Sequence, residues 1–163
     1  MKIKGVKGLK NIDPKKKICI MGIGNFDRAD DYVGIAAIEL LEKMVFPKNI
    51  KIINAGPVPE AFTGVIKKEE PDILIIIDAA QMDEKPGTIR IFTEDNVDSA
   101  YMITPHKVSM KMYLEYLRFE LKNLKALFIG IQPKSLSYMI KMDSRVEKSA
   151  HYVSQLLEEL LCE

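Results

Sequence analysis

Residues 73–77 are four isoleucines and one leucine, and this run constrains the fold more than any other part of the chain. The run shows no alternation of apolar and polar side chains, so a strand formed by it would be covered on both faces. Such coverage is typical of a central parallel strand between two layers of helices. The sequence therefore predicts an α/β fold built around residues 73–77.

The segments on either side alternate between strand and helix patterns. Strands are predicted at residues 18–23, 50–54, 73–77, 88–92 and 126–131. Helices are predicted at residues 31–44, 59–70, 108–122 and 143–161, and residues 94–102 are expected to be irregular. Residues 88–92 alternate between apolar and polar side chains, as an exposed or edge strand would. This order predicts a mostly parallel, roughly five-stranded sheet with helices on both faces.

The composition is that of a soluble globular protein. The 163 residues fit a single domain, which we place at residues 17–163 after a Lys-rich, solvated arm at residues 1–16. The net charge of +1 gives no indication of nucleic-acid binding, and no apolar run is long enough for membrane insertion. The two cysteines, Cys19 and Cys162, form no metal-type pair. A cytoplasmic protein with reduced thiols is therefore expected.

Two adjacent aspartates, Asp30 and Asp31, stand where the first predicted helix begins. Carboxylates are stabilised at a helix N-terminus by unpaired N–H groups and the helix dipole. Both residues could therefore be capping groups. Alternatively, one of them caps the helix and the other points into a cleft as a ligand or an acid–base group. The sequence leaves both interpretations open.

The turn before this helix contains Gly22-Ile23-Gly24, which raises the possibility of a dinucleotide-binding loop. Three observations disfavour it. The third glycine position is occupied by Asp27, the loop carries several carboxylates where a pyrophosphate needs free N–H groups, and the second strand ends in Asn54 rather than an acid. Nucleotide binding is therefore not expected.

Polar side chains follow most of the predicted strands, at the edge of the sheet where α/β proteins bind ligands. They are Asn25, Asp27, Asp30, Asp31, Asn54, Asp78, His106 and Gln132. Asp31, Asp78 and His106 would supply two carboxylates and one imidazole, a set that suits Zn²⁺ or Ni²⁺ with water in the open positions. Each residue alone is more commonly a cap, a turn residue or a surface group, so this structural explanation stays open. His151 is expected to face solvent.

A covalent nucleophile is not evident. The chain contains no Gly-x-Ser-x-Gly motif, and Cys19 lies inside a predicted strand. Ser109 and Ser135 have no evident His or Asp partners. If the protein is a hydrolase, metal-assisted hydrolysis is expected rather than covalent catalysis.

Four separated segments resemble the hydrogenase maturation endopeptidases, and in particular the subgroup that acts on hydrogenase-3, the formate-hydrogenlyase type. They are Gly22-Ile23-Gly24-Asn25 with Asp30-Asp31 and Gly34; Ile76-Ile77-Asp78-Ala79 with Pro86-Gly87-Thr88-Ile89-Arg90-Ile91; Thr104-Pro105-His106-Lys107; and Phe128-Ile129-Gly130-Ile131-Gln132-Pro133. The segments occur in the family's order, and the resemblance covers the chain from about Lys17 onward. Tyr32 departs from the glycine of many members, and Pro105 from their threonine. Tyr32 would narrow the cleft.

The resemblance implies a three-layer α/β/α sandwich and an endopeptidase activity. Its substrate would be a [NiFe]-hydrogenase large-subunit precursor, whose C-terminal extension is removed after nickel insertion. By position, Asp31, Asp78 and His106 are the implied catalytic and metal-binding residues. The metal would be nickel carried by the substrate, or another divalent ion such as zinc held at the same site.

Two questions stay open. If the ion activates water, Asp30 could be the base, although capping of the helix is the simpler role for it. A non-catalytic, nickel-dependent binding or checkpoint protein of hydrogenase assembly is the alternative function.

Overall fold

Seven strands form one mixed sheet in the part of the chain that the computed structural model describes, residues 2–97, 101–102 and 109–162. They are β1 (Ile3–Lys4), β2 (Ile18–Gly22), β3 (Ile50–Asn54), β4 (Ile73–Gln81), β5 (Ile89–Thr93), β6 (Tyr101–Met102) and β7 (Lys125–Ile131). The strand order is β1-β5-β7-β4-β2-β3, and β6 pairs with β4. The sheet is mostly parallel, as predicted, with antiparallel pairing of β5 to β7 and of β6 to β4.

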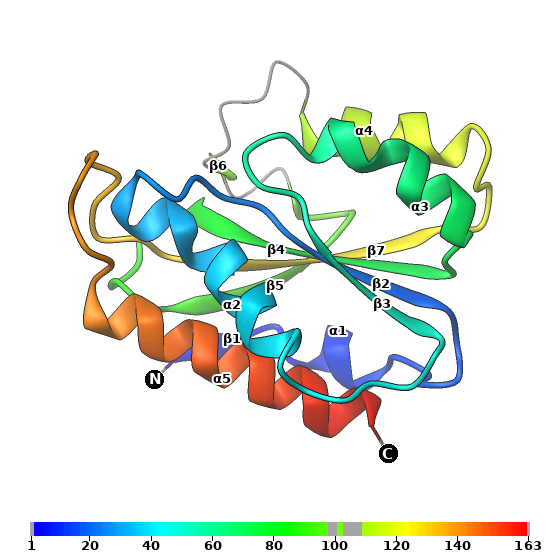
Figure 1. Ribbon diagram of the computed structural model, residues 1–163, viewed down its shortest axis with the longest axis horizontal. Helices are drawn as coiled ribbons and strands as arrows, with labels where there is room; N and C mark the ends of the chain where they lie inside the picture. The colour runs from blue at the N-terminus through cyan, green and yellow to red at the C-terminus, as the bar shows by residue number, and fades with distance from the viewer. Residues whose placement is uncertain (1, 98–100, 103–108, 163) are drawn as a thin grey trace.

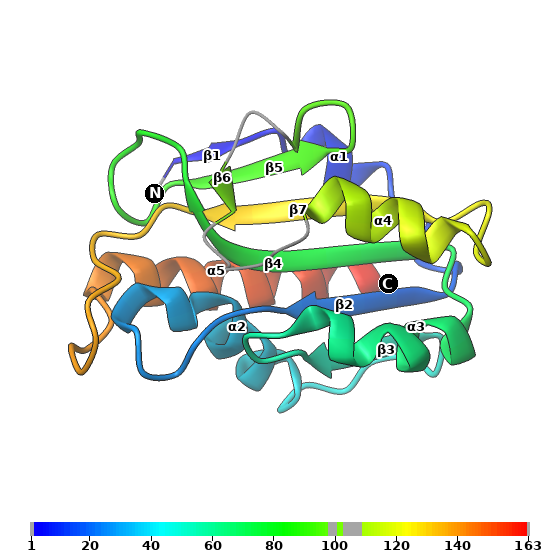
Figure 2. The same ribbon diagram turned by 90° about the horizontal axis from the view of Figure 1, so that it is seen from above.

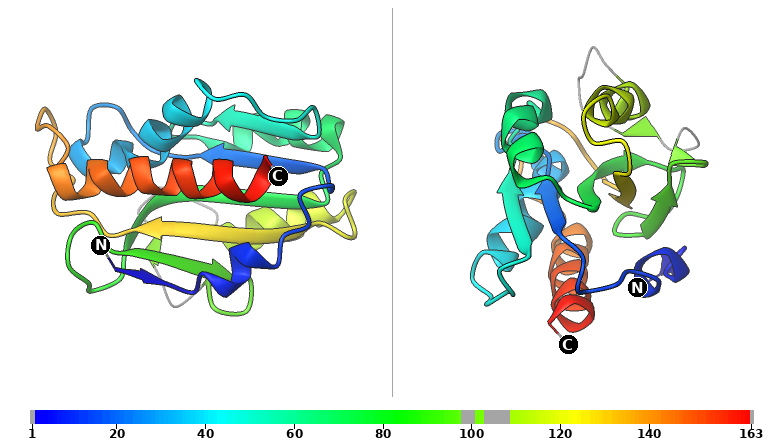
Figure 3. Two further views of the ribbon diagram at one scale, coloured as in Figure 1. Left: turned by 90° about the horizontal axis from the view of Figure 1, so that it is seen from below. Right: turned by 90° about the vertical axis from the view of Figure 1, so that its right-hand side faces the viewer.

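Helices cover both faces of this sheet, which confirms the three-layer arrangement (Figure 1). They are α1 (Lys7–Lys10), α2 (Val33–Leu41), α3 (Thr63–Glu69), α4 (Met110–Arg118) and α5 (Ser144–Leu161), with 3₁₀ turns η1 (Ala29–Tyr32) and η2 (Pro59–Phe62). Helices α3 and α4 lie on one face and α2 and α5 on the other, as the end view in Figure 3 also shows. No helix among the described residues is long and apolar enough to cross a membrane.

Strand β4 is the central strand that its apolar run predicts. Its neighbours are β2 and β7, and eight of its nine residues are buried. Alternate residues enter two separate cores: Ile75 and Ile77 pack in the core under α2 and α5, whereas Leu74 and Ile76 pack in the core under α3 and α4. By the same alternation, Asp78 faces the α3–α4 side of the sheet.

The expectation of a solvated arm at residues 1–16 is wrong for its first part. Strand β1 pairs in parallel with β5, with Ile3 opposite Ile89, and the side chain of Leu9 in α1 is 1% exposed. The apolar residues Ile3, Val6 and Leu9 pack against the core under α5. Lysines dominate the composition of residues 1–16, so the pattern formed by these three apolar residues is not evident from the sequence.

This packing also corrects the prediction for residues 88–92. Strand β5 is neither exposed nor at an edge, because β1 pairs with one side of it and β7 with the other (Figure 2). Its alternation reflects partial exposure of Arg90, whose guanidinium makes an ion pair with Glu84. A further difference is β6, two residues of strand in a segment that was expected to be irregular.

Candidate functional site

Strand β4 runs past its neighbour β2 at the carboxyl edge of the sheet. The last residue of β2, Gly22, pairs with Ile77, and β4 continues to Gln81. Asp78 was expected just after the strand but lies within it, opposite Gly130 of β7. Because β2 has already ended, Asp78 lies at the step where one side of β4 is no longer covered by a strand.

Close backbone packing places η1 and α2 against this step. A Cβ atom on Gly34 would lie 2.2 Å from the Ile23 carbonyl oxygen and 2.4 Å from that of Ile77. A Cβ atom on Gly24 would lie 2.2 Å from the Asp31 carbonyl oxygen. Only glycine allows such approaches. As a result η1, which carries Asp31, contacts β4, which carries Asp78.

Asp31 is a buried carboxylate with an unused oxygen. Its side chain is 1% exposed, and within the described residues its Oδ1 atom has no hydrogen-bond partner. Oδ2 lies 3.9 Å from Nη1 of Arg28. Burial raises the pKa of the Asp31 carboxyl, and this effect outweighs the opposing effects of Arg28 and of the Asn25 backbone. A buried acceptor without a donor is unusual and fits a group that contacts a ligand.

Asp78 is fully buried at the same edge, and the elements that carry Asp31 and Asp78 contact each other, so the fold brings together the segments of two of the three predicted site residues. The third, His106, lies outside the described residues. Within the described residues, no group of three or more His, Cys, Asp or Glu side chains could hold a metal ion. Strand β6 is the last described segment before His106, and it pairs with Ala80 and Gln81, just beyond Asp78.

Arg28 belongs to the site and was not identified from the sequence. Besides its contact with Asp31, its Nε donates a hydrogen bond to the Leu136 carbonyl oxygen at 3.3 Å. Its guanidinium lies 5.4 Å from the centre of the Tyr138 ring. The only sequence signal was a basic residue three positions before Asp31, because Leu136 and Tyr138 are more than a hundred residues away.

Asp30 has a different role from the one expected. It makes no capping bond to its own helix. Instead Oδ2 accepts hydrogen bonds from the backbone N–H groups of Lys134 at 2.7 Å and Ser135 at 3.0 Å, and Oδ1 accepts one from Asp143 at 2.7 Å. The Asp30 N–H donates to the Ser135 carbonyl oxygen at 3.2 Å. Asp30 therefore fixes both ends of the loop of residues 133–143, which joins β7 to α5.

Asp143 secures the far end of this loop and caps α5. Its Oδ1 accepts hydrogen bonds from the Arg145 N–H at 3.0 Å and from Arg145 Nε at 2.8 Å. The Arg145 side chain contributes most to holding the pKa of the Asp143 carboxyl well below its ordinary value of 3.8. The Lys134 ammonium lies 3.4 Å from Oδ2.

We expect Asp143→Ala to lower the free energy of unfolding by about 1 kcal/mol at pH 7, through the lost cap. The folded state holds the Asp143 proton less tightly than the unfolded state, so its charge stabilises the fold above pH 3.8 and this stabilisation is lost as pH falls toward the lowered pKa. Urea titrations at several pH values should show the difference between wild type and variant shrinking in acid. A constant difference would contradict this assignment.

The other polar residues at this edge have local structural roles. Asn25 Oδ1 accepts a hydrogen bond from the Asp27 N–H, and Asn54 Oδ1 accepts one from the Gly56 N–H. Gln132 is buried, and its Oε1 accepts a hydrogen bond from the Met82 N–H at 2.7 Å. Each of these side chains therefore holds a local turn or the end of a strand.

Three side chains were considered as nucleophiles from the sequence, and the structure places each of them in a buried or hydrogen-bonded environment. Cys19 is buried, and burial raises the pKa of its thiol to about 12. Ser109 caps α4 by accepting a hydrogen bond from the Met112 N–H. Ser135 Oγ accepts a hydrogen bond from the Ser137 N–H. None of these groups is arranged as an activated nucleophile.

Tyr32 lies beside Asp31 and is half-buried. Its ring makes an edge contact with Phe26, with 5.1 Å between ring centres. Burial, together with a hydrogen bond to Glu39, raises the pKa of the Tyr32 hydroxyl. His151 is exposed, as expected, and lines a shallow cavity with Tyr32 and Glu39.

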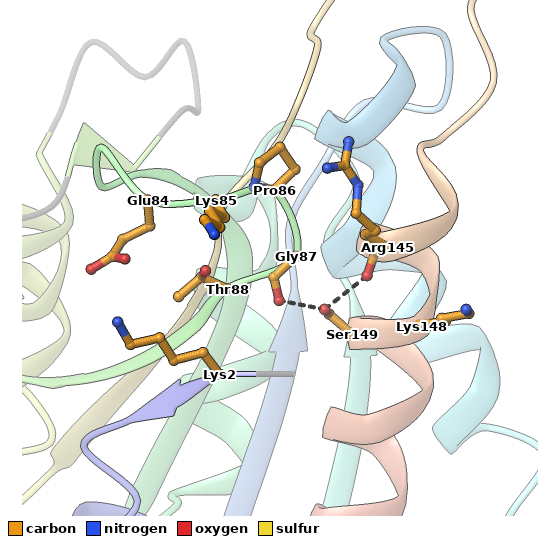
Figure 4. A pocket seen from close by; sticks show the side chains of 9 residues that line it. All are labelled: Lys2, Glu84, Lys85, Pro86, Gly87, Thr88, Arg145, Lys148 and Ser149. Carbon is orange, nitrogen blue, oxygen red and sulfur yellow. Dashed lines mark hydrogen bonds between the residues drawn. The ribbon is translucent and has the colours of Figure 1, made fainter.

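A cavity of about 610 Å³ lies between the turn at Gly87 and the first turns of α5, away from the aspartates (Figure 4). Ser149 Oγ closes its base by donating a hydrogen bond to the Gly87 carbonyl oxygen at 2.6 Å. The basic lining is partly neutralised, since Arg145 pairs with Asp143. The cavity contains neither Asp31 nor Asp78, so it is separate from the site.

Comparisons with known proteins agree on one family. The sequence model of the hydrogenase maturation protease family matches residues 35–160. A proposed hydrogenase maturation protease of Methanocaldococcus jannaschii is 32% identical over 157 residues, which cover 89% of this chain and 90% of the relative. The hydrogenase 3 maturation protease of Escherichia coli is 29% identical over 140 residues, which cover 85% of this chain and 87% of the relative.

A solved structure shows the same fold. The crystal structure of the [NiFe] hydrogenase maturation protease HycI from Thermococcus kodakarensis superimposes with a TM-score of 0.84 at 24% identity. The match covers 96% of this chain and 99% of that chain. The fold described above, a central sheet between two layers of helices, is thus one that is already known.

Proposed function

Since the chain belongs to the hydrogenase maturation protease family and is therefore a hydrolase, we propose that it is the endopeptidase that removes the C-terminal extension of a [NiFe]-hydrogenase large-subunit precursor after nickel insertion. The observation that supports this proposal most directly is the buried Asp31 carboxylate, whose Oδ1 atom accepts no hydrogen bond from any described residue, next to the strand that carries Asp78. An enzyme that recognises a metal ion in its substrate needs a carboxylate that is already in position to bind that ion.

The donor set fits a divalent transition ion. Asp31, Asp78 and His106 would supply two carboxylates and one imidazole, which are ligands that nickel and zinc accept. In the proposed reaction the nickel is part of the substrate, and these side chains bind it and so position the adjacent peptide bond. A divalent ion at this position can polarise a carbonyl group or lower the pKa of a bound water.

The chain's own residues prepare the site for this role. The glycines at positions 24 and 34 allow η1 to pack on the sheet edge, and Arg28 lies beside the Asp31 carboxylate. Burial excludes water from both aspartates, which strengthens their attraction for a cation. We further propose that the protein acts in the cytoplasm, where free thiols such as Cys19 and Cys162 persist.

The test is a cleavage assay on large-subunit precursors purified with and without nickel, with the product mass read by mass spectrometry. Loss of a C-terminal peptide only from the nickel-loaded precursor would support both the peptidase activity and nickel recognition. Equal cleavage of both forms would reject nickel recognition. Binding without cleavage across a panel of precursors, by folded protein, would favour the non-catalytic checkpoint function.

A further inference from the structure

Four large apolar side chains are exposed together beside the candidate site, and we call them the apolar rim. They are Phe26, Tyr138, Met139 and Ile140, with exposures of 75%, 65%, 89% and 55%. Phe26 lies in the turn before η1, and the other three lie at the tip of the loop of residues 133–143. Figures 2 and 3 show this loop, in orange, beside η1 at the carboxyl edge of the sheet. Clustered exposed apolar side chains on a soluble protein commonly mark a site of interaction.

Hydrogen bonds to the loop backbone hold the apolar rim in place although it faces solvent. Asp30 fixes both ends of the loop, and the Met139 N–H donates a hydrogen bond to the Asp27 carbonyl oxygen at 3.0 Å. Met139 itself has φ of 60°, a left-handed conformation that residues other than glycine rarely adopt. Strained backbone held by surrounding hydrogen bonds is typical of functional segments.

Arg28 connects the apolar rim directly to the site. It lies 3.9 Å from the Asp31 carboxylate, donates a hydrogen bond to the loop and stacks against Tyr138. On the other side, Phe26 packs on Tyr32, the residue that follows Asp31. A polypeptide seated on the apolar rim would therefore lie next to Arg28 and Tyr32, the two residues that connect the rim to Asp31.

We propose that the apolar rim is the docking surface for the substrate, and that an apolar segment of the precursor with acidic neighbours occupies it. The acidic neighbours follow from charge: residues 133–145 carry the basic side chains Lys134, Lys141 and Arg145 against the single acid Asp143. Asp143 pairs with both Lys134 and Arg145 but neutralises only one charge, so the segment keeps a net positive charge. The substrate is the favoured occupant because a second copy seated here would cover the edge that must receive the scissile bond. This inference rests on the proposed function.

The test compares two matched double variants. Met139→Ser with Ile140→Ser removes the apolar rim at its tip, whereas Met112→Ser with Phe119→Ser removes exposed apolar side chains, 57% and 84% exposed, at and just after helix α4. Binding to immobilised nickel-free precursor, which is not expected to be cut, is measured by biolayer interferometry. Cleavage of nickel-loaded precursor is measured in parallel.

We expect the rim variant to bind the precursor about tenfold more weakly than wild type, as when buried anchors of an interface are removed. We expect the α4 variant to stay within about twofold of wild type, since distant surface changes act independently. Cleavage at limiting precursor should fall with the affinity, while the urea midpoint of the rim variant stays unchanged.

Equal binding by wild type and rim variant, or equal losses in both variants, would overturn the docking proposal. The docking proposal would also be overturned if light scattering showed a wild-type dimer that the rim substitutions disrupt while precursor binding stays unchanged. The occupant of the apolar rim would then be a second copy of the chain. If the wild-type protein binds the precursor but never cuts it, the proposed function is rejected. The comparison of precursor binding between the two variants then still decides the docking proposal. Wild-type protein that binds neither form of the precursor would overturn the docking proposal outright.

Discussion

Asp31→Asn is expected to abolish precursor cleavage while leaving the fold at least as stable as wild type. The substitution keeps the shape of the side chain and removes the charge that would contact the substrate metal. We expect the cleavage rate to fall roughly a thousandfold, the scale seen when a group acting on the reacting centre is lost. Product masses over a time course, read beside a urea unfolding curve, measure both effects.

The stability side of this prediction follows from burial. A buried, ionised carboxylate with an oxygen that has no partner in the described part of the chain costs free energy in the folded state, so neutralising it should raise the free energy of unfolding by about 1 kcal/mol. Asp78→Ala and His106→Ala should also abolish cleavage. A folded Asp31→Asn variant that still trims the precursor at more than about a tenth of the wild-type rate would contradict the site assignment.

Asp30→Asn, one position earlier, is expected to have the opposite effect on stability. Three backbone N–H groups donate to the two oxygens of Asp30, and an amide would place an NH₂ group against at least one of them. Each buried donor left without an acceptor costs about 1–3 kcal/mol, so we expect a loss of at least about 1–3 kcal/mol in the free energy of unfolding. Urea denaturation of the two variants side by side measures this contrast.

The same experiment decides whether Asp30 is a catalytic base. If Asp30 is a catalytic base, Asp30→Asn should lose cleavage while its stability stays unchanged. If Asp30 instead anchors the loop of residues 133–143, the variant should lose stability, and cleavage should weaken because the loop becomes disordered. Equal unfolding midpoints for Asp30→Asn and wild type would show that the loop does not depend on this carboxylate.

The sequence was sufficient for most of the architecture, because the alternation of strands and helices depends on local patterns. The apolar run at residues 73–77 identified the central strand, and polar residues after strands led to the prediction, still to be tested, of a functional edge. The division of roles between Asp30 and Asp31 could not be predicted. They are adjacent acids in the same turn, and their partners, the N–H groups near Lys134 and the guanidinium held by Tyr138, depend on a loop about a hundred residues away.

The start of the chain was misinterpreted for a related reason. Ile3 and Leu9 carry too weak a pattern among the lysines to predict structure, and the partner of β1 lies 86 residues further along the chain, at Ile89. His106 stays a prediction, because it lies outside the described residues. The features that sequence patterns could not predict thus depend on contacts between segments that lie far apart in the sequence.

The position of β4 between an early and a late strand also sets an order of events during synthesis on the ribosome. β2 precedes β4, but β7, its other neighbour, ends at Ile131, and the loop that Asp30 anchors ends at Asp143. A nascent chain that has emerged only as far as α4 contains Asp31 and Asp78 but lacks β7, which pairs with β4 beside Asp78, and the loop that Asp30 anchors. We therefore expect proteolytic competence to arise only when synthesis is nearly complete.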